Sequence, residues 1–160
     1  MEEKIKKVIE ILTNNKQTIS TMESCTGGGV ANAITNIEGA SEVLKFSAVT
    51  YSNLFKEKMG VDKNVIDTYS VYSMETAEEM SKNISKFTSS DYGVGITGKL
   101  NRVDINNPYG EDNIVFISIY DKNKDKFYNQ KVEVKEKTRK DNKNIVINKI
   151  FSQLLDILND

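Results

Sequence analysis

The residue types that could do chemistry gather in one short segment, Thr21-Met-Glu-Ser-Cys-Thr-Gly-Gly-Gly-Val30. Its β-branched start predicts a strand, the glycines predict a tight turn, and the following residues predict a helix. Backbone N–H groups at such a turn, reinforced by the helix dipole, can hold an anion or an oxyanion. Ser24 lies at the mouth of the turn as a candidate nucleophile. An ordinary helix cap followed by turn glycines would give the same pattern, so the residues alone leave both interpretations open.

A serine nucleophile needs a base, and the chain contains no histidine. This excludes Ser-His-Asp and Cys-His catalysis. Lysine can replace histidine when burial lowers its pKa, and Lys56 follows a predicted strand, where sites of α/β proteins usually lie. For any one lysine among twenty, a surface charge is the more common role. Cys25 competes as nucleophile, although a small residue behind a turn more often packs than reacts.

The elements that position this segment follow from hydrophobic periodicity. The spacing of Ile5, Val8, Ile9 and Leu12 predicts a first helix that ends near Asn14. Further helices are predicted over 30–37, 53–59, 74–88 with Ser73 as N-cap, and 147–158; strands are predicted over 18–22, 45–51, 92–97, 114–120 and 127–134. The last two strands form a hairpin, and 99–112 is irregular. These elements predict a layered α/β domain with a mixed sheet, in one domain over 1–160.

Composition excludes several classes of function. The 22 basic and 23 acidic residues give a net charge of −1, which argues against a nucleic-acid-binding protein. No apolar run approaches the ~20 residues of a membrane helix, and the N-terminus shows no secretory signal. One cysteine and no histidine leave no zinc ligand set, whereas a carboxylate site for magnesium stays open. A single cysteine fits a reducing cytoplasm.

Several motifs together resemble the CinA C-terminal domain family, whose stand-alone members are nicotinamide-mononucleotide deamidases. The matching segments cover most of the chain: Glu23-Ser-Cys-Thr-Gly-Gly28, Gly39-Ala-Ser41, Val49-Thr-Tyr-Ser-Asn53 with Lys56, Met59-Gly-Val61, Ser70-Val-Tyr-Ser73, Asp91 to Gly98 and Asn107-Pro-Tyr-Gly110. The resemblance implies a three-layer α/β/α sandwich, a cytoplasmic homodimer without cofactor, and conversion of nicotinamide mononucleotide and water to nicotinic acid mononucleotide and ammonia.

The resemblance also implies roles for individual residues. Ser24 would be the nucleophile and Lys56 the general base, with Tyr51 beside them in the catalytic group. The implied substrate-binding residues are Ser41, Cys25, Thr26, Gly27, Gly28, Thr97, Gly98 and Arg139. Backbone N–H groups from Cys25 to Gly27 would form an oxyanion hole or a phosphate cradle, and the pattern does not choose between them.

The chain departs from the family in the segment Thr97-Gly-Lys-Leu-Asn-Arg102, where the family has Thr-Gly-Ile-Ala-Gly-Pro. Lys143 also replaces the second of two arginines four residues apart, which turns a bidentate anion contact into a point charge. Three functions stay open: deamidation of nicotinamide mononucleotide, hydrolysis of another small amide, or nucleotide binding without turnover. Retention of both Ser24 and Lys56 favours an enzyme.

Overall fold

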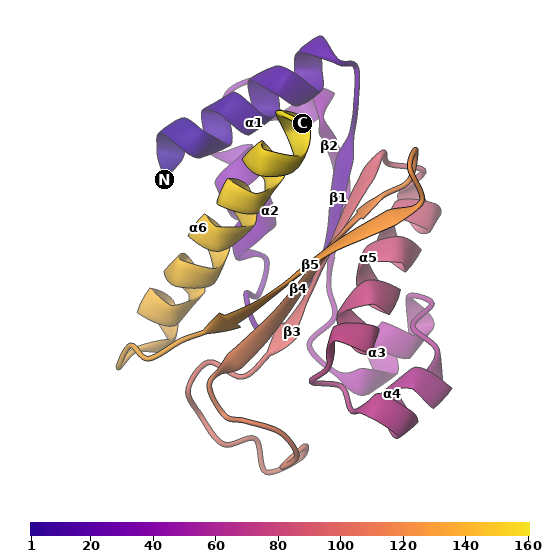
Figure 1. Cartoon of the computed structure of the whole chain (residues 1–160), viewed down its shortest axis with the longest axis vertical. Coiled ribbons are helices and arrows are strands. Elements are labelled where there is room, and N and C mark those ends of the chain that lie inside the picture. The colour runs from indigo at the N-terminus through magenta and orange to yellow at the C-terminus, as the bar shows by residue number, and fades with distance from the viewer.

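The computed structural model describes residues 1–160 and has a five-stranded sheet at its centre (Figure 1). The strands are β1 (Ile19–Glu23), β2 (Leu44–Val49), β3 (Tyr92–Gly98), β4 (Ile114–Asp121) and β5 (Lys126–Glu133). They lie in the order β2-β1-β3-β4-β5. The first three strands are parallel, and β4 and β5 are antiparallel to their neighbours. The predicted mixed sheet and its terminal hairpin are therefore confirmed.

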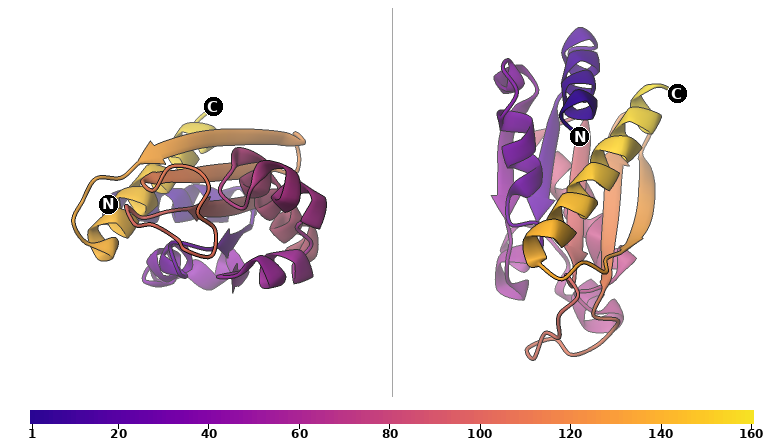
Figure 2. Two further views of the ribbon diagram at one scale, coloured as in Figure 1. Left: turned by 90° about the horizontal axis from the view of Figure 1, so that it is seen from below. Right: turned by 90° about the vertical axis from the view of Figure 1, so that its left-hand side faces the viewer.

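Helices cover both faces of the sheet, which confirms the three-layer sandwich (Figures 1 and 2). One layer contains α1 (Glu2–Asn14), α2 (Gly29–Thr35) and α6 (Arg139–Leu158). The other contains α3 (Asn53–Lys58), α4 (Lys63–Tyr69) and α5 (Met74–Thr88). Each layer encloses its own apolar cluster: α1, α2 and α6 bury the larger one against the sheet, and α4 and α5 bury the smaller one.

Amphipathic spacing explains the long helices. All four apolar residues predicted to line α1 are buried, and α6 buries a stripe from Val146 to Ile157. The Ser73 side chain caps α5 by accepting a hydrogen bond from the Thr76 N–H, as predicted. Gly93 and Gly95 let α5 lie directly on β3, because a Cβ at either position would collide with the α5 backbone.

Several predictions at this level were wrong or incomplete. The last helix begins at Arg139 rather than at residue 147, and β2 ends at Val49 rather than at residue 51. The second helix ends at Thr35 rather than at residue 37, and the short helices α4 and η1 (Ala40–Glu42) were not expected. In α4 only Ile66 is buried, so no apolar repeat exists for sequence analysis to detect. No helix of the structure is both long and apolar enough to cross a membrane.

The sheet topology brings together the three loops that follow β1, β2 and β3, at the carboxyl ends of these strands. The parallel strands β1, β2 and β3 end at the same side, and β1 lies between the other two. The chain leaves β1 toward β2 through one helical layer and returns from β2 to β3 through the other (Figure 1). Ligands of open α/β sheets bind where the direction of winding changes in this way. The irregular segment between Gly98 and Ile114 crosses this same end of the sheet (Figure 2).

Candidate active site

Ser24 follows β1 directly and stays tied to the sheet. Its N–H donates to the Ile96 carbonyl on β3 over 3.1 Å, and its own carbonyl accepts from the Gly27 N–H over 2.9 Å. Gly28 closes the turn with φ of 93°, a left-handed conformation that favours glycine. The hydroxyl of Ser24 is thereby held, half-buried, at the carboxyl end of the central parallel strand.

The buried carboxylate of Glu23 occupies the start of α2. It accepts hydrogen bonds from the N–H groups of Val30 and Ala31, both over 2.9 Å, and from the hydroxyls of Thr21 and Thr26. The amides of Val30 and Ala31 at this helix start are consequently unavailable to an external anion. The Gly27 N–H is also engaged, whereas the N–H groups of Cys25 and Thr26 donate to no acceptor within the chain.

Lys56 reaches Ser24 from α3. Its Nζ lies 3.1 Å from the Ser24 Oγ and 2.8 Å from the Thr50 carbonyl oxygen, and the residue is only 2% exposed. No carboxylate lies within ion-pair distance of the ammonium. Burial lowers the pKa of Lys56 to about 8. At pH 7 about a tenth of the amine is therefore unprotonated, far more than for an exposed lysine, and its lone pair can accept the Ser24 proton.

Cys25 is buried beside this pair and is a poor nucleophile. Burial raises the pKa of its thiol to about 12, although the nearby charges of Lys56 and Arg139 lower it. The thiolate, which is the reactive form, is thus scarce at neutral pH. Of the two candidate nucleophiles, only Ser24 has a base within hydrogen-bond distance.

Ser24 opens into a cavity of about 410 Å³. Its lining comes from the β1 turn, the segments before α3 and α5, the start of α6 and the irregular segment: Ser24, Cys25, Tyr51, Tyr72, Gly98, Lys99, Leu100, Arg102, Val103, Asp104, Ile105, Asn106 and Arg139. The volume lies within the range of small-molecule sites. Nowhere in the chain do three carboxylate or thiol side chains gather in a way that could hold a metal ion.

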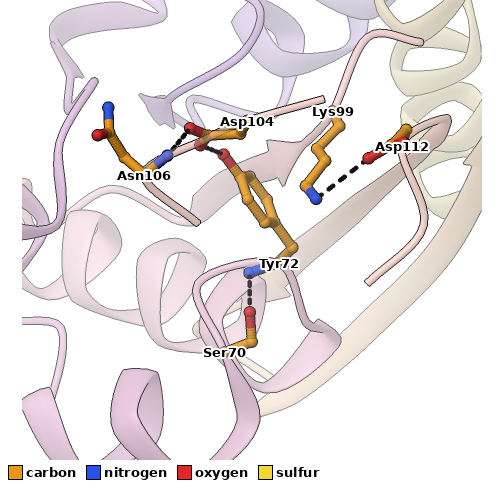
Figure 3. A network of polar contacts seen from close by, with 6 residues as sticks. All are labelled: Ser70, Tyr72, Lys99, Asp104, Asn106 and Asp112. Carbon is orange, nitrogen blue, oxygen red and sulfur yellow. Dashed lines mark hydrogen bonds and ion pairs between the residues drawn. The ribbon is translucent and has the colours of Figure 1, made fainter. Parts of the chain in front are cut away.

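A polar network forms one wall of this cavity (Figure 3). The Tyr72 hydroxyl donates to the Asp104 carboxylate, and burial followed by this bond raises the pKa of Tyr72. The Lys99 ammonium lies 5.1 Å from the centre of the Tyr72 ring and 3.3 Å from a carboxylate oxygen of Asp112. Sequence analysis gave none of these four residues a role in the site. Tyr72 and Lys99 stood only within quoted segments, Lys99 in the one that departs from the family.

Other predicted residues also reach the cavity. Tyr51 is exposed, and its hydroxyl accepts from the Arg139 guanidinium over 2.9 Å. Gly98 lines the cavity at the end of β3. Thr97 is fully buried, and its hydroxyl donates to the Val71 carbonyl over 2.9 Å, so that it supports the segment before α5 instead of facing the cavity.

Four predicted residues lie elsewhere. Thr26, Gly27 and Gly28 line a second cavity of about 700 Å³ between α1, α2 and α6, on the other side of the turn from Ser24. Ser41 precedes β2, whereas Ser24 follows β1, and the register pairs Ile19 with Leu44 and Glu23 with Val49. Ser41 therefore lies at the opposite end of the sheet, and the expectation that it joins this site is wrong within one chain.

Comparisons with known proteins agree with this fold. The CinA C-terminal domain profile matches residues 1–158. A Thermoanaerobacter pseudethanolicus protein named as competence-damage inducible is 45% identical over 98 residues, which are 61% of this chain and 24% of that protein. A CinA-like protein of Endomicrobium trichonymphae is 45% identical over 89 residues, 55% of this chain and 21% of that protein. The matched part thus spans about a quarter of these relatives' length.

Solved structures show the same fold over the whole chain. A competence/damage inducible protein from Agrobacterium tumefaciens has a TM-score of 0.87 at 26% identity, and the match covers 99% of this chain and 95% of that one. A CinA superfamily protein from Klebsiella pneumoniae has a TM-score of 0.87 at 20% identity, covering 99% and 97% of the two chains. Since the family profile spans nearly all of the sequence, this chain belongs to the CinA C-terminal domain family.

Proposed function

We propose that this chain is an amidohydrolase that converts nicotinamide mononucleotide and water to nicotinic acid mononucleotide and ammonia. The observation that carries the proposal is the 3.1 Å contact between the Lys56 Nζ and the Ser24 Oγ. A buried amine with a lowered pKa beside a serine hydroxyl is the arrangement that activates a serine without histidine. The choice of substrate rests on the family resemblance.

The reaction follows from the positions of these groups. The unprotonated Lys56 amine accepts the Ser24 proton while the Thr50 carbonyl holds one of its N–H groups. Ser24 attacks the carboxamide carbon, and the free N–H group of Cys25, which lines the same cavity, stabilises the oxyanion. The Lys56 ammonium then returns the proton to the departing ammonia. The same amine then deprotonates water, which attacks the acyl-enzyme, and the resulting ammonium gives this proton to the departing Ser24 oxygen as the acid is released.

The cavity suits an anionic nucleotide. Its lining includes three cationic side chains, Lys99, Arg102 and Arg139, against the single carboxylate of Asp104. Tyr51 and Tyr72 add flat aromatic surface. These features support a substrate with an aromatic amide and a phosphate.

We further propose that the chain forms a homodimer and works in the cytoplasm. Several large apolar side chains lie exposed near the edge strand β2: Phe46, Val49, Leu54, Phe55 and Phe87. The rings of Phe46 and Phe87 lie 5.4 Å apart, and exposed apolar patches are typical of protein–protein contacts. Sedimentation velocity tests the dimer, and a purely monomeric species would contradict it.

The direct test measures ammonia release from nicotinamide mononucleotide by the purified protein and by Ser24→Ala, both with EDTA. We expect release by the wild type and a loss of at least about 10³-fold in Ser24→Ala, because the covalent route is removed. Ser152→Ala, a serine on α6 away from the cavity, should keep full activity. Binding without release would favour a nucleotide-binding domain, and release only from another amide would change the substrate.

A further inference from the structure

Lys99 is one of only two buried lysines, the other being the base Lys56. It follows Gly98 at the end of β3, and its backbone N–H donates to the Ile114 carbonyl over 3.1 Å. Its side chain is 2% exposed. Removing an ammonium group from water costs several kcal/mol unless partners replace the lost hydration. The partners of this buried cation therefore indicate what it is for.

The partners of Lys99 do not satisfy all of its N–H donors. An ammonium has three N–H donors, and only one oxygen, on Asp112, accepts from Lys99, at 3.3 Å. The Tyr72 ring lies at 5.1 Å and adds a weaker attraction from its face. Two donors have no oxygen acceptor in the chain, although Lys99 lines the cavity that Ser24 opens into. A buried cation with free donors at a cavity wall is arranged to meet an anion.

No carboxylate of the cavity lining is free to pair with Lys99, so an anionic ligand can do so. Asp104, the carboxylate in the lining, is already engaged by the Tyr72 hydroxyl and the Asn106 N–H (Figure 3). Asp112 is half-exposed, so solvent weakens its hold on Lys99. Arg102 and Arg139 line the same cavity and carry the same sign of charge. An anionic group would therefore meet attraction from three cations.

We propose that Lys99 binds the phosphate monoester of the substrate and is the residue that makes the site selective for the nucleotide over the nucleoside. This inference rests on the proposed function, since it assigns a part of that substrate to a part of the same cavity. The Tyr72 ring holds the ammonium against the wall, and Asp112 is the counter-charge with which the phosphate competes. Lys99 stands where the family segment Thr-Gly-Ile-Ala-Gly-Pro has isoleucine. On this proposal, the replacement changes how the phosphate is bound.

The test compares nicotinamide mononucleotide with nicotinamide riboside, which lacks only the phosphate. The protein carries Ser24→Ala so that neither ligand is consumed, and calorimetry measures each Kd. Lys99→Met should weaken mononucleotide binding by about 10- to 100-fold, the size of a lost charge-assisted hydrogen bond, and riboside binding by less than about twofold. Lys149→Met, an exposed lysine on α6, is the matched control. No loss, or an equal loss for both ligands, would overturn the proposal.

A second variant keeps the proposal testable if Lys99→Met fails to fold. Asp112→Asn leaves the ammonium and removes its competing counter-charge. It should strengthen mononucleotide binding by about three- to tenfold and leave the riboside unchanged, in line with a modest ion-pair contribution. Unchanged or weaker mononucleotide binding would contradict the assignment.

Ammonia release by protein with an intact Ser24 separates this proposal from the enzymatic one. Release with a KM that does not depend on Lys99 overturns the phosphate assignment and leaves the amidase standing. Lys99-dependent binding of the mononucleotide without ammonia release overturns the amidase and leaves the phosphate site standing.

Discussion

The two buried lysines, Lys56 and Lys99, show how surroundings divide one residue type between two tasks. Lys56 has a serine hydroxyl and a backbone carbonyl as partners and no carboxylate, so burial lowers its pKa to about 8. Lys99 is as deeply buried but has Asp112 at 3.3 Å and the Tyr72 ring beside it. The first environment makes the neutral amine, which can act as a base, accessible near pH 8. The second supplies a carboxylate partner, as an anionic ligand would.

The largest expected effect comes from Lys56→Met. Activity should fall by about 10²- to 10⁴-fold, the usual contribution of a general base. Stability at pH 7 should not fall, because the variant removes a buried cation that lacks a counter-charge. Ammonia release and urea unfolding measure the two quantities. A variant that is both inactive and clearly destabilised would show that Lys56 is needed for the fold, and the contrast with Lys99 would fail.

The pH dependence of wild-type activity tests whether Lys56 is the base. With a Lys56 pKa of about 8, kcat/KM should rise by up to tenfold per pH unit below pH 8 and level off above it. An ascending limb centred below pH 6 or above pH 10 would assign the base to another group.

Stability should follow the same group with a definite sign. Burial lowers the pKa of Lys56 from 10.5 to about 8, so between these values the unfolded chain binds more protons than the folded one. The free energy of unfolding should therefore rise with pH across this window, and below it the cost of the buried charge stays constant. Subtracting the Lys56→Met curve isolates this effect, and a difference that is flat with pH would contradict it.

The smallest expected effect is that of Tyr72→Phe. The ring against Lys99 remains, and only the hydrogen bond to Asp104 is lost. We expect KM for the mononucleotide to rise a few-fold with kcat unchanged, and stability to fall by about 1 kcal/mol. Steady-state kinetics and thermal unfolding measure these changes. A loss in kcat instead would give Tyr72 a part in the chemistry.

Much of the fold was predictable because apolar residues recur at helix or strand spacing within its longer elements. The stripes of α1 and α6 and the hairpin of β4 and β5 are local patterns, and each was found in the expected segment. Element boundaries escaped prediction, since α6 begins at Arg139 rather than at residue 147. With one buried residue, α4 has no repeat to detect, and α2 ends early at Thr35.

The candidate site was predictable only in part. Ser24 and Lys56 were found because they lie in dense local motifs, and the structure brings their side chains together. Ser41 and Thr97 show the limit of this approach. A residue near a strand in sequence lies at one end of the sheet or the other according to strand direction, and a hydroxyl beside the cavity points inward or away according to its backbone partner.

By itself, the sequence determined which chemistry was open: with no histidine and one cysteine, a serine activated by lysine was the hydrolytic pair that its motifs offered. Only the tertiary structure decided which lysine lies beside Ser24 without a carboxylate and which lies beside Asp112. Asp112 and Tyr72 lie 13 and 27 positions from Lys99 along the chain and meet it because the irregular segment folds back over the strand ends. Burial and charge pairing depend on these long-range contacts, and no local pattern of residues encodes them.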